Sequence, residues 1–108
     1  MDITQEEDEL VKKPSLLTEE CKRMLKEATA YIAENSSETQ AEIMLMQFEK
    51  IVSLLETMPG IGSKYGNEMR RFLLGKFPYY IYYAEHKSYI SIRGIWHTSR
   101  GTEFEENA

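Results

Sequence analysis

The chain has 108 residues and a net charge of −5, with 42% hydrophobic and 29% charged residues. This composition is typical of one soluble globular domain and excludes a largely disordered chain. No apolar run approaches the roughly 20 residues that span a bilayer, so no membrane contact is predicted. The single cysteine, Cys21, excludes an intrachain disulfide and a cysteine zinc cage, and it favours a cytoplasmic protein in a reducing compartment.

Charge is divided unevenly along the chain. Residues 1–57 hold 13 acidic and 6 basic side chains, whereas residues 58–101 hold 7 basic and 2 acidic ones. We predict an acidic, flexible N-terminal arm over residues 1–12, a single domain over 13–101 and an acidic C-terminal tail over 102–108. The basic balance of the second half can mark a surface for an anionic partner, or it can simply solvate exposed faces.

The first predicted elements are a short strand and a helix. Pro14 restricts the strand over Lys13–Leu17 to a sheet edge or a strand start, because proline lacks the amide donor. Thr18 is typical of a helix N-cap, since Glu19 and Glu20 then lie at the positive end of the helix dipole. Apolar residues recur after it at three- and four-residue spacing, which predicts one face of an amphipathic helix. They are Cys21, Met24, Leu25, Ala28, Tyr31 and Ile32.

A second helix is predicted between two boundary signals. Ser37 with Gln40 three residues later forms a capping box, and Pro59 and Gly60 end the helix. Between them runs one continuous apolar stripe of Ala41, Met44, Leu45, Phe48, Ile51, Val52, Leu55 and Met58. The short polar link after Asn35 makes the two helices an antiparallel hairpin, whose apolar side must cover a sheet.

Three strand-like runs occupy the C-terminal part, at Met69–Leu74, Tyr79–Ala84 and Tyr89–Trp96. Links this short force antiparallel pairing into a meander. The glycine-rich segment 60–67 is predicted as a loop and fits neither a P-loop nor a dinucleotide motif. The predicted fold class is therefore α+β: an N-terminal αα-hairpin packed on a small twisted antiparallel sheet, in the order β-α-α-β-β-β.

Side chains of the last strand alternate between the two faces of the sheet. Ile90 and Ile92 share the face expected under the hairpin, while Arg93 and His97 share the outer face. Gly94 is a candidate for a β-bulge, which would change this alternation beyond it. The outer face is thus predicted to collect arginine, histidine and tyrosine side chains.

Two functions suit such a face. In the first it cleaves RNA: His97 acts as acid or base, and Arg93 and Arg100 hold the phosphate. The side chains that would stack on unpaired bases are Tyr79, Tyr80, Tyr82 and Tyr83. In the second it binds a protein, for which tyrosine and arginine are the usual anchors. Each residue alone is explained better by packing or a local hydrogen bond, but the cluster at a strand end favours function. No metal site and no cofactor are predicted.

Four motifs follow one another within residues 13–101. They are LLETMPGIG at the end of the second helix, then MRRF, then FPYYIYY, and finally ISIRGIWH running into HTSR. Together with the order of elements they resemble the ParE/RelE superfamily of toxins from type II toxin–antitoxin systems. The resemblance is closest to the ParE-like branch, whose members are often called plasmid stabilisation proteins.

This resemblance implies a toxin that a cognate antitoxin holds inactive. RelE-like members cut mRNA on the ribosome, whereas ParE-like members poison DNA gyrase. Tyr80 stands where the RelE-like strand has an arginine, while His97 and Arg100 match the HxxR ending of ParE-like chains. We therefore predict a gyrase inhibitor that is not itself an enzyme. The alternatives are a ribosome-dependent mRNA endonuclease using His97, Arg100 and Arg93, and a non-toxic protein-interaction module on the same fold.

The resemblance also implies partners and contact residues. The expected partners are a cognate antitoxin and DNA gyrase, or the ribosome and mRNA under the endonuclease alternative. We expect a homodimer or a toxin–antitoxin hetero-oligomer. The residues predicted to contact the target or the antitoxin are Arg70, Arg71, Tyr83, Arg93, His97 and Arg100.

Overall fold

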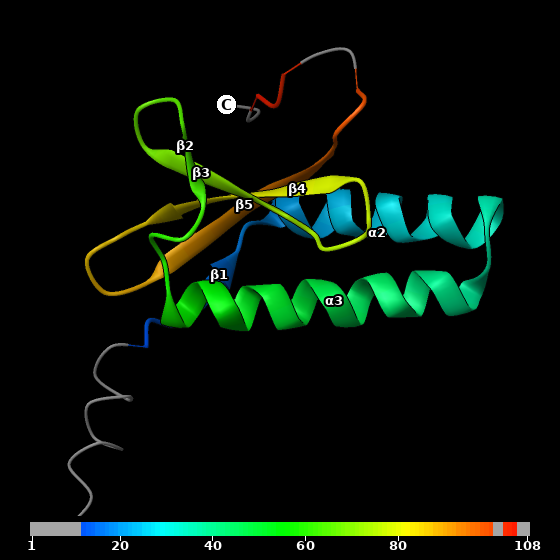
Figure 1. The fold of residues 1–108 in the computed structure, drawn as a ribbon, viewed down its shortest axis with the longest axis horizontal. Coiled ribbons are helices and arrows are strands. Elements are labelled where there is room, and N and C mark those ends of the chain that lie inside the picture. Colours follow the sequence, from blue (N-terminus) through cyan, green and yellow to red (C-terminus); the bar gives the residue numbers. More distant parts are fainter. Residues whose placement is uncertain (1–11, 101–102, 106–108) are drawn as a thin grey trace, which may run out of the picture.

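The structure is a computed structural model that describes residues 12–100 and 103–105. Two antiparallel helices form one layer and a twisted sheet packs against them (Figure 1). The elements in chain order are β1 (Ser15–Leu17), α2 (Glu19–Asn35), α3 (Glu38–Thr57), β2 (Ser63–Tyr65), β3 (Met69–Leu73), β4 (Tyr79–Glu85) and β5 (Ile90–His97). The predicted α+β class and αα-hairpin are confirmed, with one strand more than the sequence indicated.

Both helices begin at the predicted caps. The Thr18 hydroxyl accepts a hydrogen bond from the Cys21 amide at 3.0 Å, and the Ser37 hydroxyl accepts one from the Gln40 amide at 3.0 Å. Each cap satisfies a backbone donor that the helix itself leaves unpaired, a contribution of about 1 kcal/mol. The helix ends fixed in this way set the direction in which the hairpin lies over the sheet.

The sheet is mixed, and this corrects the prediction of a purely antiparallel one. Its order is β1-β5-β4-β3-β2, and β1 pairs with β5 in parallel, with Ser15 opposite Ile90. No short turn joins β1 to β5, so their direction is not forced. At the other edge β2 pairs with β3 inside the segment predicted as a loop. The glycines of this segment suggested a loop, but the structure has a β-hairpin whose turn contains Gly66 at a positive φ of 66°.

The predicted bulge lies beside Gly94. Tyr82 pairs with Gly94 and Tyr83 pairs with Ile92, so Arg93 is the additional residue of β5. The bulge moves His97 to the helix side of the sheet, opposite Tyr79, and this corrects its predicted place beside Arg93 on the outer face.

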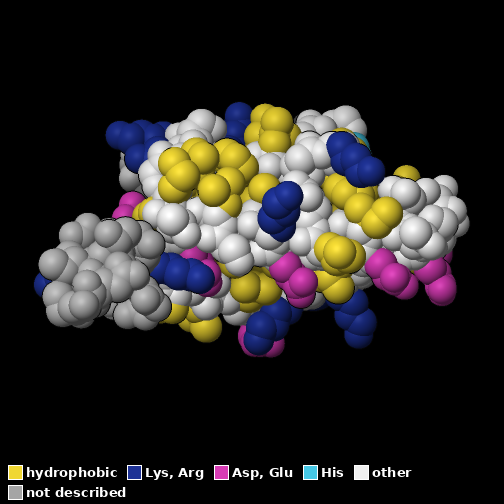
Figure 2. All heavy atoms as spheres, turned by 60° about the horizontal axis from the view of Figure 1, so that its bottom comes forward, with side chains coloured by type: hydrophobic (Ala, Val, Ile, Leu, Met, Phe, Trp, Pro, Cys, Tyr) yellow, Lys and Arg dark blue, Asp and Glu magenta, His cyan; other side chains and the backbone are white. Residues whose placement is uncertain are grey.

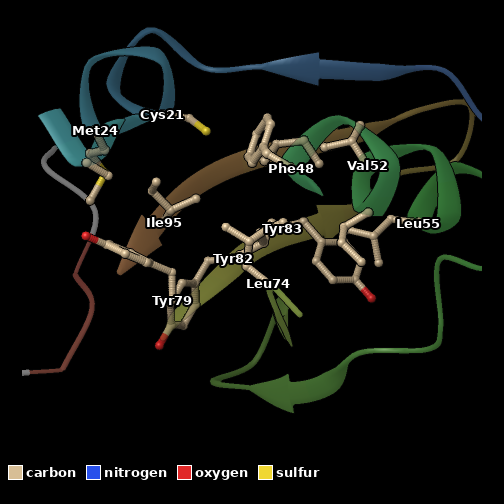
Figure 3. Close-up of a cluster of buried hydrophobic side chains, with 14 of the residues drawn as sticks. Cys21, Met24, Phe48, Val52, Leu55, Leu74, Tyr79, Tyr82, Tyr83 and Ile95 are labelled. Atoms are coloured by element: carbon tan, nitrogen blue, oxygen red, sulfur yellow. The ribbon is translucent and has the colours of Figure 1, made fainter. Parts of the chain in front are cut away.

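The core lies between the hairpin and the inner face of the sheet. Side chains from α2, α3, β4 and β5 converge there (Figure 3). Cys21 is among those with no exposed surface, and burial raises the pKa of its thiol to about 12, so Cys21 is a packing residue. The fully buried residues also include Met44, Leu55, Leu74, Tyr83, Ile81, Ile90 and Ile92.

The ends of the predicted domain are only partly visible. The predicted acidic arm, apart from Lys12, lies outside the described residues, and so does most of the predicted tail. Phe104, which follows the predicted domain end, is nevertheless buried at 2% exposure. Within the described part of the chain, no helix is long and apolar enough to cross a membrane.

Candidate functional site

The outer face of the sheet, opposite the helices, carries the candidate site. Directly paired residues share a face, and Arg71 lies opposite Tyr82 while Tyr80 lies opposite Trp96. Tyr65 joins them from β2, with its ring 4.8 Å from that of Tyr82. The result is a surface of aromatic rings and arginine built by four neighbouring strands.

Two guanidinium groups lie over aromatic rings on this surface. The Arg71 Cζ is 4.3 Å from the centre of the Tyr80 ring, and the Arg100 Cζ is 4.0 Å from the centre of the Trp96 ring. Both are cation–π contacts, which hold a guanidinium group without using up its hydrogen-bond donors. Among the described residues, no carboxylate forms an ion pair with Arg71 or Arg100. Arg71 also donates from Nη1 to the Tyr82 hydroxyl at 3.4 Å. A guanidinium group has five donors, so both arginines have donors left for an anionic partner group.

A hollow of about 170 Å³ lies beside these two arginines. Its walls include Arg71, Tyr80, Trp96, Arg100 and Glu103. Ordinary small-molecule sites measure roughly 300–1,000 Å³, so this hollow suits one side chain of a partner better than a whole ligand.

A larger groove of about 650 Å³ lies between α2 and the ends of β4 and β5. Both signs of charge border it, with Arg23 and Glu27 from the helix and Arg100 from beyond β5. Tyr31 stands at this groove with 59% of its surface exposed. His97 and Arg100 border both the groove and the smaller hollow, so one elongated partner segment could contact the two together.

His97 is held by the chain that follows it. The Ser99 amide donates to His97 Nδ1 at 3.1 Å, and the Ser99 hydroxyl lies 2.8 Å from the same nitrogen. An amide donor requires an unprotonated Nδ1, so the neutral ring carries its proton on Nε2. The ring also packs edge-on against Tyr79, with 5.0 Å between the centres. His97 thus forms the local hydrogen bond that the packing interpretation predicted.

Arg70 and Tyr83 hold a loop together. The Tyr83 hydroxyl donates to the Pro59 carbonyl at 2.7 Å and accepts from the Gly62 amide at 2.9 Å, while Arg70 Nη1 donates to the Gly62 carbonyl at 2.7 Å. Tyr83 has no exposed surface, and burial raises the pKa of its hydroxyl. Tyr83 offers no exposed surface to a partner in this structure, and its hydroxyl instead holds the loop between Pro59 and Gly62.

Arg93 is separated from the other predicted contact residues by the bulge. Its carbonyl lies 3.4 Å from the Thr18 hydroxyl, which links the bulge to the start of α2. The residue is half-buried and has a further interaction within the chain. The structure therefore brings Arg71, His97 and Arg100 together only at the small hollow, which His97 reaches from the helix side of β5, and it places Arg70, Tyr83 and Arg93 elsewhere.

Phe104 also belongs to this surface, although no pattern in the sequence indicated it. Its ring stacks on Tyr82 with the centres 4.3 Å apart and the planes 15° apart, and it meets Trp96 edge-on at 5.6 Å. Its carbonyl accepts a hydrogen bond from the Tyr65 hydroxyl at 2.9 Å. The only signal in the sequence was a single aromatic residue in an otherwise acidic tail.

The tyrosines of β4 offer little surface for base stacking. Tyr79, Tyr82 and Tyr83 are 8%, 2% and 0% exposed, and only Tyr80 is half-buried. Among the residues the structure describes, no group of three His, Cys, Asp or Glu side chains could hold a metal ion. On the outer face, arginine and aromatic side chains surround a small hollow, and these residue types are the ones enriched at protein interfaces.

The fold has a solved counterpart. The chain matches a structure described as "Chromosomal ParDE TA system from P. aeruginosa" with a TM-score of 0.72 over 81% of this chain and 97% of that one. The identity is 14%, so this likeness concerns the fold. No curated protein matches the sequence.

The αα-hairpin and the mixed five-stranded sheet define an α+β protein whose outer sheet face collects arginine and aromatic side chains. The family described as "ParE toxin of type II toxin-antitoxin system, parDE" matches residues 16–101. The chain therefore belongs to the ParE toxin family of type II toxin–antitoxin systems, as the sequence motifs predicted. Membership of this family implies a cognate antitoxin as partner.

Proposed function

We propose that this toxin acts in the cytoplasm by inhibiting DNA gyrase, with the outer sheet face as its contact surface. The observation that carries the proposal is the pair of arginines, Arg71 and Arg100, held over aromatic rings and without carboxylate partners among the described residues. Arginine and tyrosine presented in this way are the usual anchors of protein interfaces. The cognate antitoxin neutralises the toxin by covering the same face.

Several features favour inhibition by binding over RNA cleavage. Tyr80 occupies the strand position at which an endonuclease of this superfamily is expected to have arginine. His97 accepts a hydrogen bond at Nδ1, and a general acid would need its other nitrogen to face the leaving oxygen. Three of the four β4 tyrosines are buried and present no open face to a base.

Purified toxin, gyrase and relaxed plasmid test the proposal directly. We expect inhibition of supercoiling or trapped cleaved DNA, and loss of both with Arg71→Gln/Arg100→Gln. Lys22→Gln/Lys50→Gln is the matched control, since it removes the same charge from exposed helix positions and keeps full activity. Discrete mRNA cuts on ribosomes, with supercoiling unaffected, would instead establish the endonuclease alternative. The mass of the toxin alone and with its antitoxin distinguishes a homodimer from a toxin–antitoxin hetero-oligomer.

A further inference from the structure

The chain covers part of its own outer face with residues 103–105. Phe104 lies in a slot between three aromatic side chains: its ring stacks on Tyr82 and meets Trp96, and its carbonyl is bound by the Tyr65 hydroxyl. Only 2% of Phe104 is exposed. Gly94 forms the floor of the slot, because a Cβ there would lie 2.6 Å from the Phe104 ring.

The charges around this slot complement an acidic segment. Glu103 lines the hollow that Arg71 and Arg100 also line, yet it forms no ion pair with either arginine. Burial, followed by the charge of Glu103, raises the pKa of the Tyr65 hydroxyl, which agrees with carboxylates close to this face. The slot thus combines a place for one aromatic ring with two arginines that can donate hydrogen bonds to carboxylates.

We propose that this slot is the docking site for an acidic peptide segment of the partner protein that carries one aromatic anchor. The chain's own Glu103–Glu105 has this chemistry and occupies the slot until the partner displaces it. The inference rests on the proposed function in placing a partner on the outer face, and it adds the chemistry of the segment that binds.

The internal segment is suited to be displaced. The contacts described for it are those of the Phe104 ring with Tyr82 and Trp96 and one backbone hydrogen bond to Tyr65, and neither Arg71 nor Arg100 is ion-paired with Glu103 or Glu105. Attachment to the same chain makes even a weak contact effective, because the local concentration is high. A partner that supplies the same aromatic anchor and also pairs with the arginines replaces it.

A peptide with the sequence of residues 101–108 tests the inference. Trp96 is the only tryptophan of the chain and contacts the slot, so its fluorescence reports binding. We expect full-length Phe104→Ala to bind the peptide with a saturable signal. The wild-type chain should need a peptide concentration at least about tenfold higher for half-saturation. Its own Phe104 competes for the slot at a local concentration of roughly 1 mM. A peptide with alanine in place of its phenylalanine should not bind.

Matched variants separate the contributions of charge and ring. In the Phe104→Ala background, Arg71→Gln/Arg100→Gln should weaken peptide binding and reduce its dependence on salt, whereas Lys22→Gln/Lys50→Gln should leave both unchanged. Circular dichroism establishes that each variant is folded. Phe104→Leu is the second variant, with a smaller apolar side chain that cannot stack, and should bind the peptide more tightly than wild type.

Two results would overturn the inference. One is a folded Phe104→Ala or Phe104→Leu chain that shows no saturable peptide signal, and the other is equal peptide affinity for these variants and wild type. Gyrase inhibition is a separate readout. Peptide binding without effect on supercoiling would refute the proposed target and leave the docking site, whereas supercoiling inhibition without peptide binding would do the reverse.

Discussion

The two faces of one sheet differ in how they are covered. Beneath the helices, Ile81, Ile92 and Tyr83 have no exposed surface, and two long amphipathic helices cover them (Figure 3). On the outer face, the guanidinium groups of Arg71 and Arg100 lie over aromatic rings. Among the described residues, Phe104 and its neighbours cover part of this face. The same strands supply both faces through alternation. We therefore expect stability to depend mainly on the inner face, and we propose the outer face for recognition.

The helical side of the molecule supports this division. On the face turned forward in Figure 2, acidic, basic and apolar side chains are interspersed, and no continuous basic field is seen. A mixed surface of this kind is typical of a solvated face. It differs from the outer sheet face, where guanidinium groups are held over rings in one small area.

The largest contrast is expected from one substitution on each face. Ile81→Ala should lower the free energy of unfolding by about 2–5 kcal/mol, because it opens a cavity in the inner core. Arg71→Gln should change it by about 1 kcal/mol or less, since only surface cation–π contacts with Tyr65 and Tyr80 and one long hydrogen bond to Tyr82 are lost. Urea denaturation measures both values. Equal losses would contradict the division of roles between the faces.

Tyr83→Phe tests whether this residue holds the fold or binds a partner. The substitution leaves the Gly62 amide and the Pro59 carbonyl without their partner, so we expect a loss of about 1–3 kcal/mol in the free energy of unfolding. Gyrase inhibition by the folded variant should be unchanged. A variant as stable as wild type that no longer inhibits would return Tyr83 to the contact surface.

Thr18→Ala probes the link between α2 and the bulge of β5. The Thr18 hydroxyl caps the helix and lies 3.3 Å from the Ile92 carbonyl, so its removal should destabilise the chain by about 1–2 kcal/mol. Thr18→Ser keeps the cap and is the matched control, expected within about 0.5 kcal/mol of wild type. Thermal unfolding compares the two, and an equal fall in Tm would argue against the cap.

The smallest expected effect is the pH dependence that Cys21 gives to the free energy of unfolding. Its folded pKa of about 12 lies above the ordinary 9.0, so the stability it contributes is complete below pH 9 and is lost as the pH rises towards 12. We expect about 1 kcal/mol less stability at pH 10 than at pH 9, and a smaller fall in Cys21→Ala. A thiol reagent at pH 8 should modify Cys21 only through unfolding. Rapid modification of the folded chain would show that the thiol is accessible.

Much of the inner architecture could be predicted from the sequence, and the reasons are local. Thr18 and Ser37 indicate where the helices begin, because their hydroxyl groups suit the N-cap position. The apolar stripes indicate which helix faces are buried. The parallel edge pair of β1 and β5 could not be predicted in this way, because the sequence between them sets no direction. The strand β2 was not predicted because the glycines around it suggested a loop, whereas Gly66 forms the turn between β2 and β3.

The outer site was predictable in composition but not in arrangement. The HxxR motif identified His97 and Arg100, yet alternation alone could not separate Arg71 from its neighbour Arg70. Pairing decides this, since Arg71 lies opposite Tyr82 while Arg70 lies opposite Tyr83. Phe104 was missed because a residue after the last strand returns to the sheet through tertiary contacts that no local pattern encodes.

Growth arrest on induced expression tests the outer face as the toxic surface most directly. Wild type and Lys22→Gln/Lys50→Gln should both arrest growth, and co-expression of the cognate antitoxin should restore it. Arg71→Gln/Arg100→Gln, expressed to the same level and folded by circular dichroism, should allow growth equal to that of cells without toxin. Full growth arrest by this folded double variant would contradict the account, because the arginines of the outer face would then be unnecessary for the toxin's action.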